Sequence, residues 1–185
     1  IKWSLNKILC LDFENFKKPI IGLFGTCGNS TWREDFIEIY DSEGLEYFNP
    51  QKTDWNPNDA ANEAFHLAND EIILFPITSE TYGLGSLAEV GFSILNAISL
   101  DNSRFFVVLI DDDVTEELKK ENPILAEESK RNRALVRNHL KELRISNLYM
   151  VNNMEQLFEA SIVLYQAAIA KNFMSKFNLH VNQNI

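Results

Sequence analysis

Two short glycine-containing turns carry most of the residues in this sequence that could do chemistry. The first, Gly25-Thr26-Cys27-Gly28-Asn29-Ser30, follows an apolar run and leads into a segment with helical spacing. Glycine permits close backbone approach to a ligand, and a helix start offers unpaired N–H groups and a positive dipole end. This turn is therefore a candidate cradle for a phosphate or a sugar, with Arg33 adding charge. It also fits an ordinary strand-to-helix turn with Ser30 or Thr31 as N-cap.

The second turn, Gly83-Leu84-Gly85-Ser86, precedes an apolar helix expected over 87–100, with Glu89 in its first turn. The helix dipole there favours the ionised carboxylate, by about 0.3–1 kcal/mol at an exposed position. Such a carboxylate can attack an anomeric carbon or stabilise an oxocarbenium ion, and Gly83 and Gly85 would let a substrate approach. Ser86 and Glu89 also fit a capping box, in which Glu89 only satisfies the Ser86 N–H.

Strand and helix signals alternate along the whole chain. Short apolar runs predict strands over 18–24, 45–48, 71–77, 104–110 and 147–151. Apolar residues at helical spacing predict helices over 31–42, 59–69, 87–100, 114–143 (interrupted near Pro123) and 154–173. This alternation selects an α/β fold, a doubly wound parallel sheet of about five strands with helices on both faces. Ligands bind such sheets at the carboxyl ends of the strands, where both turns lie.

Composition limits the classes of function. The chain has 185 residues, 45% hydrophobic and 24% charged, which is typical of a globular domain. Its net charge of −10 disfavours binding to a nucleic acid polymer but permits a small anion held by backbone N–H groups. No apolar stretch could span a membrane, no signal peptide is evident, and two cysteines are too few for a disulfide framework, so we expect a cytoplasmic protein.

The domain is expected to cover residues 18–177. Residues 1–17 would form an extension, in which 7–13 could add an edge strand, and 178–185 a loose polar tail. The histidines are too scattered for a metal site, and no cofactor is expected. The run Asp111-Asp112-Asp113 could bind a cation but fits a solvated helix start better.

Several segments taken together resemble the nucleoside 2-deoxyribosyltransferase-like family. The similarity covers residues 20–98, and its segments are 25–33, Tyr47-Phe48-Asn49-Pro50, Asp54-Trp55, Glu63 and 86–90. The resemblance implies a flavodoxin-like fold and cleavage of the N-glycosidic bond of a (deoxy)nucleoside. Glu89 would be the nucleophile and form a covalent deoxyribosyl-enzyme.

The resemblance also implies roles for other residues. The first turn would help to form the nucleoside pocket, and Asp54, Glu63 or Asp70 would hold the base and handle its proton. A partner subunit of a homo-oligomer would complete each site, and Asn147 resembles such a contributed residue, although it also fits a loop cap. Transferases of this family carry an aspartate shortly before the Gly-Leu-Gly turn. Here that position falls on Thr81, and the nearby acidic residue is Glu80.

Three alternatives stay open. The protein could hydrolyse a nucleoside or a nucleoside 5′-monophosphate, with the first turn holding the phosphate, or it could be a non-catalytic nucleotide-binding module. Cys27 to Arg33 also fits C-x5-R and resembles the low-molecular-weight tyrosine phosphatases, in which a thiolate attacks phosphorus. That family needs an Asp-Pro dipeptide as general acid, and this sequence has none.

Overall fold

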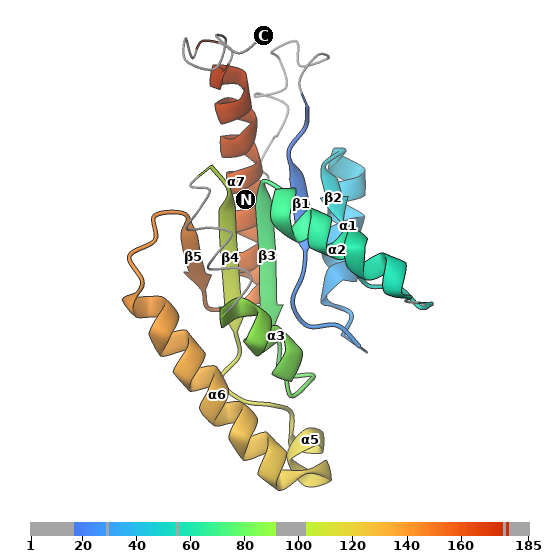
Figure 1. The fold of residues 1–185 in the computed structure, drawn as a ribbon, viewed down its shortest axis with the longest axis vertical. Helices are drawn as coiled ribbons and strands as arrows, with labels where there is room; N and C mark the ends of the chain where they lie inside the picture. The colour runs from blue at the N-terminus through green and yellow to red at the C-terminus, as the bar shows by residue number, and fades with distance from the viewer. Residues whose placement is uncertain (1–16, 29, 55, 92–102, 176, 178–185) are drawn as a thin grey trace.

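The computed structural model describes residues 17–28, 30–54, 56–91, 103–175 and 177. Five parallel strands form one sheet in the order β2-β1-β3-β4-β5 (Figure 1), which is the flavodoxin-like order. The predicted α/β class and parallel sheet are therefore confirmed. The strands are β1 Ile20–Leu23, β2 Glu46–Phe48, β3 Ile72–Ile77, β4 Phe105–Ile110 and β5 Leu148–Val151.

Helices cover both faces of the sheet. On one face α1 and α7 pack against alternate strand residues, including Ile21, Leu74 and Val107. On the other face α3 and α6 pack, with Leu67 of α2, against residues that include Ile73 and Val108. The helices are α1 Trp32–Glu43, α2 Pro57–Asn69, α3 Leu84–Glu89, α5 Glu116–Glu121, α6 Pro123–Glu142 and α7 Met154–Ser175.

Proline and asparagine define two of the helix starts. Asn56 caps α2 in a capping box with Asp59, and Pro57 occupies the first turn, so the helix begins two residues before the predicted start at 59. Asn122 likewise caps α6 by accepting the N–H of Leu125 at 3.1 Å. The predicted interruption near Pro123 is therefore confirmed, because Pro123 begins a new helix there.

The end of β1 is fixed closely onto β3. A Cβ at Gly25 would lie 2.3 Å from the carbonyl oxygen of Pro76, and Gly25 has φ +90°, so the position requires glycine. The N–H of Thr26 donates to the same oxygen at 2.8 Å. In a parallel strand the N–H and C=O of one residue point toward the same neighbouring strand. Pro76 therefore turns the side that lacks an N–H toward the chain beyond the end of β1, where no ladder hydrogen bond would form. This contact places the first turn at the carboxyl end of β3.

Some predictions fall outside the described residues. They are the edge strand over 7–13, the helix over 87–100 beyond Gly91, and the tail over 178–185. Among the residues that the structure describes, no helix combines the length and apolar character needed to cross a membrane.

Candidate functional site

The two glycine-containing turns leave the neighbouring strands β1 and β3 at their carboxyl ends. In the order 2-1-3-4-5 the succession of strands reverses direction between β1 and β3. Flavodoxin-like folds bind their ligands at this switch point. The topology therefore brings the two sequence-predicted turns to the edge of the sheet where a ligand site is expected.

Hydrogen bonds of buried hydroxyl groups join the first turn to residues 78–80, which lead from β3 into the second turn. Thr26 is 1% exposed, and its side-chain oxygen accepts the N–H of Thr78 at 2.9 Å. Ser30 is 2% exposed, and its hydroxyl donates to Oε2 of Glu80. Thr78 donates its own hydroxyl to the same oxygen at 3.2 Å. Thr26 and Ser30 thus fix the first turn against the segment that follows β3. This role differs from the substrate contacts predicted for both residues and from the N-cap alternative for Ser30.

Arg33 lies next to the first turn and is 1% exposed. A guanidinium has five N–H donors, and each donor of Arg33 meets a protein acceptor. The acceptors are the carbonyl oxygens of Leu23, Phe24 and Thr26, the side-chain oxygen of Gln51 and the sulfur of Cys27, at 2.6–3.5 Å. Arg33 therefore shapes the end of β1 and the first turn and has no donor left for a ligand.

This arrangement weighs against the phosphatase alternative. In a C-x5-R phosphatase the arginine and the loop amides stabilise the phosphate during thiolate attack. Here the Cys27 sulfur accepts from Arg33 at 3.5 Å, but the remaining donors of Arg33 bind other protein atoms. The side chain of Cys27 itself is exposed.

Arg133 on α6 plays the same part for the second turn, and sequence analysis did not single it out. It is 0% exposed, and all five of its N–H groups are used. The acceptors are the carbonyl oxygens of Ile77, Thr78, Thr81 and Asp111 and the hydroxyl of Ser129, at 2.7–3.3 Å. A Cβ at Gly83 would lie 3.2 Å from this guanidinium and 2.9 Å from Ile77, so Gly83 packs against the protein.

Part of the first turn, by contrast, stays exposed to solvent. Thr31 is the N-cap residue of α1, but its side chain makes no capping hydrogen bond, and Ser30 binds Glu80 instead. Cys27 and Gly28 are exposed. The amide of Gln51 donates to the Gly28 carbonyl at 2.8 Å and so connects the loop after β2 to the turn. Asn29, a predicted substrate-binding residue, lies outside the described residues.

The helix that carries Glu89 begins earlier than predicted. Gly83 is the N-cap of α3 with φ 66°, so Ser86 lies within the helix and Glu89 is its last residue. The capping box of Ser86 and Glu89 is therefore wrong, and so is the placement of Glu89 in the first turn. Gly85 faces open space, because a Cβ there would meet no atom within 4 Å. Of the two glycines expected near a substrate, only Gly85 lines free space.

Glu89 also has a different electrostatic environment from the one predicted. Its side chain reaches solvent. Partial burial of its carboxyl nevertheless raises the pKa of Glu89 above its ordinary value, and the negative charge of Glu63 raises it further. The predicted stabilisation of the ionised form by the helix start is absent, because Glu89 lies beyond the first turn of the helix. The structure thus brings two carboxyl groups, from α2 and α3, into electrostatic contact.

The structure separates the three acidic candidates of the sequence. Glu63 is half-buried, and its charge acts on both Glu89 and Arg33. Asp54 is exposed in the loop after β2. Asp70 is the C-cap residue of α2, before β3 and at the other end of the sheet, and its Oδ1 lies 2.8 Å from Nδ1 of His66. Of the three, Glu63 is the one that accompanies Glu89.

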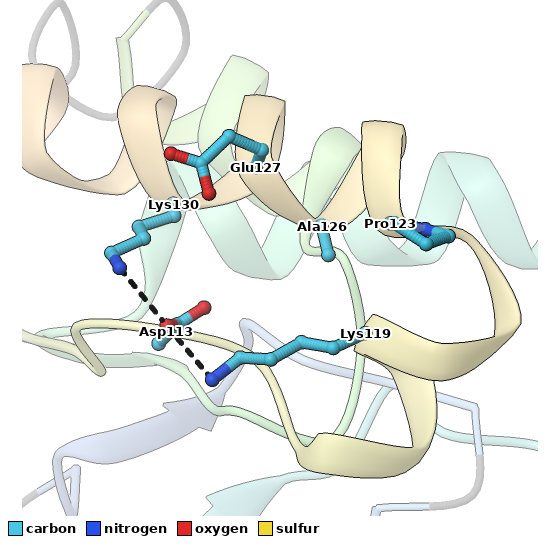
Figure 2. A pocket seen from close by; sticks show the side chains of 6 residues that line it. All are labelled: Asp113, Lys119, Pro123, Ala126, Glu127 and Lys130. Atoms are coloured by element: carbon cyan, nitrogen blue, oxygen red, sulfur yellow. Dashed lines mark ion pairs between the residues drawn. The ribbon is translucent and has the colours of Figure 1, made fainter.

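The acidic run after β4 is engaged by basic side chains. Asp113 pairs with Lys119 at 3.0 Å and with Lys130 at 3.4 Å, and Asp112 pairs with Arg137. Figure 2 shows both lysines converging on Asp113 at a pocket of about 250 Å³ beside α5 and α6. Within the described ranges, no group of three His, Cys, Asp or Glu side chains could hold a metal ion.

Asn147 is 4% exposed, and its amide donates to the carbonyl of Arg104 at 2.6 Å. This contact connects the amino ends of β4 and β5, which agrees with the loop role weighed from the sequence.

Searches for similar proteins add no assignment: no protein-family model and no curated protein matches the chain.

Proposed function

We propose that this protein cleaves the N-glycosidic bond of nucleosides, with Glu89 as the nucleophile. The observation that carries the proposal is the electrostatic effect of Glu63 on Glu89, which lies in the helix that starts at the second turn, by the switch point of the sheet. The charge of Glu63 raises the pKa of Glu89, and two neighbouring carboxyl groups can divide the roles of nucleophile and general acid. The family resemblance of the two turns supports the same assignment.

The first step is displacement at the anomeric carbon. A carboxylate oxygen of Glu89 attacks C1′, the C1′–N bond breaks with its electron pair passing to the base, and an ester joins Glu89 to the sugar. Glu63, in its carboxylic acid form, donates a proton to the leaving base and becomes a carboxylate. The products of this step are a free base and a covalent glycosyl-enzyme.

The second step reverses the first with a new acceptor. Glu63 takes a proton from an incoming base, whose nitrogen attacks C1′ and releases Glu89 as a carboxylate. Transfer of the sugar between bases results. When water is the acceptor, the same sequence hydrolyses the nucleoside, and this hydrolase is the alternative enzyme. A partner subunit that completes the site in a homo-oligomer and a cytoplasmic location stay predictions from the sequence.

Base exchange tests the proposal. The protein is incubated with deoxyinosine, with and without adenine, and the bases and nucleosides are separated by chromatography. We expect new deoxyadenosine from the natural protein and from Glu117→Gln, an exposed substitution on α5, but at least a thousandfold less from Glu89→Ala. Hypoxanthine without deoxyadenosine would assign hydrolysis. Equal product from Glu89→Ala would contradict the proposal, and tight binding without product would favour the non-catalytic nucleotide-binding module.

A further inference from the structure

The side of α7 that points away from the sheet is apolar but exposed. Between Glu159 and Lys171 the helix contains no charged residue. Four exposed residues at helical spacing form what we call the outer face of α7: Val163, Ala167, Ala170 and Met174. Of these, Val163 is 56% and Met174 59% exposed. A surface helix normally turns a polar face to water, so this apolar face indicates that another segment covers it.

The chain enters the described structure beside the C-terminal end of the same helix. Lys17 is the first described residue, and its carbonyl oxygen accepts the side-chain amide of Asn172 at 3.5 Å. Figure 1 shows the last turns of α7 extending past the amino ends of β3 and β4, where the sheet no longer covers them. Residues 1–16 are therefore attached to the structure next to the outer face.

The sequence of residues 1–16 suits this apolar face. Its apolar residues Ile1, Leu5, Ile8 and Leu9 have the spacing of one apolar helix face. Passing around α7, about 10 Å across, takes about five extended residues, which are 12–16. Residues 1–11 would then span about 17 Å as a helix, against about 18 Å along α7 from Glu159 to Lys171.

The charges of the two segments match in the orientation that the attachment imposes. Because residues 12–16 start from the C-terminal end of α7, Lys2 falls toward Glu159 and Asp12 toward Lys171. Glu159 and Lys171 are exposed, and neither takes part in an ion pair with another described residue. Opposite charges at both ends favour this arrangement over the reverse one.

We propose that residues 1–16 fold back along the outer face of α7 and cover it within the same chain. Ile1, Leu5, Ile8 and Leu9 then pack on Val163 and Met174. The small side chains of Ala167 and Ala170 between them permit close approach. The apolar surface of α7 is thus an intramolecular docking surface for the chain's own N-terminal segment.

A nitroxide on Cys10 tests the proposal in the full chain, with Cys27→Ser so that one thiol remains. The nitroxide weakens the NMR signals of backbone amides close to it. We expect at least twofold weaker signals over 163–174 and unchanged signals in α5, which lies beyond the opposite edge of the sheet (Figure 1). Val163→Asp and, independently, Ala167→Asp should restore the α7 signals, because each inserts a charge into the apolar contact.

Ile124→Asp is the matched control, because Ile124 is an apolar residue of α6 that is 80% exposed. It should leave the α7 signals weakened. A stronger effect on β2 than on α7 would assign the edge strand predicted over 7–13 and overturn the proposal, as would no effect on either. Isotope-labelled protein without nitroxide, mixed with unlabelled protein that carries it, detects docking between molecules. Weaker α7 signals in that mixture would show that a second copy covers the face, which would also overturn the proposal.

Discussion

Arg33 and Arg133 hold the two turns of the candidate site from opposite faces of the sheet. Arg33 comes from α1 and Arg133 from α6, and these helices belong to the two different core clusters. Each guanidinium uses all five donors, mostly on backbone carbonyls at the strand ends. Backbone carbonyls just past the end of a parallel strand have no hydrogen-bond partner on the neighbouring strand. Burying them without such a partner would cost free energy of folding. The two arginines therefore make an irregular edge of the sheet rigid.

This role predicts that lysine cannot replace Arg133. Lysine has three donors on one nitrogen and cannot reach acceptors spread around a planar fork. We expect Arg133→Lys to lower the free energy of unfolding by about 2–4 kcal/mol, because several buried carbonyls lose their partner. Urea denaturation measures the change. Arg131→Lys on the same helix is the control, since Arg131 has a side chain that is 78% exposed, and its effect should stay within about 0.5 kcal/mol. Equal effects would contradict the role.

The glycines of the two turns should respond differently to alanine. Gly25 combines φ +90° with contact to the Pro76 backbone, so Gly25→Ala should lower the free energy of unfolding by about 2–5 kcal/mol. Gly85 lies in α3 and faces open space, so Gly85→Ala should be neutral or stabilise by up to about 1 kcal/mol. Thermal denaturation of both variants checks this. Similar losses of stability would mean that Gly85 is packed.

Removal of the Glu63 charge should lower the pKa of Glu89. Because the charge of Glu63 raises that pKa, Glu63→Gln leaves only the contribution of burial. Glu89 should then ionise at a lower pH, which carboxyl carbon NMR can follow residue by residue. Asp54→Asn is the control, because Asp54 does not contribute to the pKa of Glu89. An unchanged titration of Glu89 in Glu63→Gln would contradict the pairing of the two carboxyl groups.

Asp70 should make stability depend on pH. Burial raises the pKa of Asp70 to about 6 from 3.8, despite the contact with His66. Its Oδ2 is buried without a hydrogen-bond partner. The folded state binds the proton more tightly, so the stabilising contribution is complete below pH 3.8 and is lost as the pH rises through 6.

Asp70→Asn removes this dependence. Relative to the natural protein, the variant should gain on the order of 3 kcal/mol in its free energy of unfolding between pH 4 and pH 7. Urea denaturation across that interval gives both curves. Parallel curves for the two proteins would show that Asp70 does not retain its proton on folding.

Much of the fold could be predicted from the sequence, because buried parallel strands are continuous apolar runs. The segment Ile-Ile-Leu-Phe within β3 and Phe-Phe-Val-Val-Leu-Ile in β4 lie within a residue of their predicted bounds. Pro123 likewise predicted a break at the position where α6 begins. These signals are local, so no knowledge of the tertiary structure was needed to find them.

The candidate site was predicted less completely, because its contacts join distant parts of the chain. Glycines at 83 and 85 look alike in the sequence, yet only Gly83 has a positive φ and starts the helix. That difference of three residues places Glu89 beyond the first turn of the helix. Arg133 lies 52 residues from Thr81, whose carbonyl it binds, and its exposed neighbours give it the pattern of a surface helix. The sequence signal for burial is that Arg133 lies at helical spacing from apolar residues on one face of its helix.

Trapping of the covalent glycosyl-enzyme tests the central claim most directly. The protein is mixed with deoxyinosine, quenched in acid within milliseconds to seconds, digested and analysed by peptide mass spectrometry. We expect a deoxyribosyl ester on Glu89 that disappears when adenine is added before the quench and is absent from Glu89→Gln. Catalytic release of hypoxanthine with no adduct at any time point, or an adduct on another residue, would contradict the assignment of Glu89 as the nucleophile.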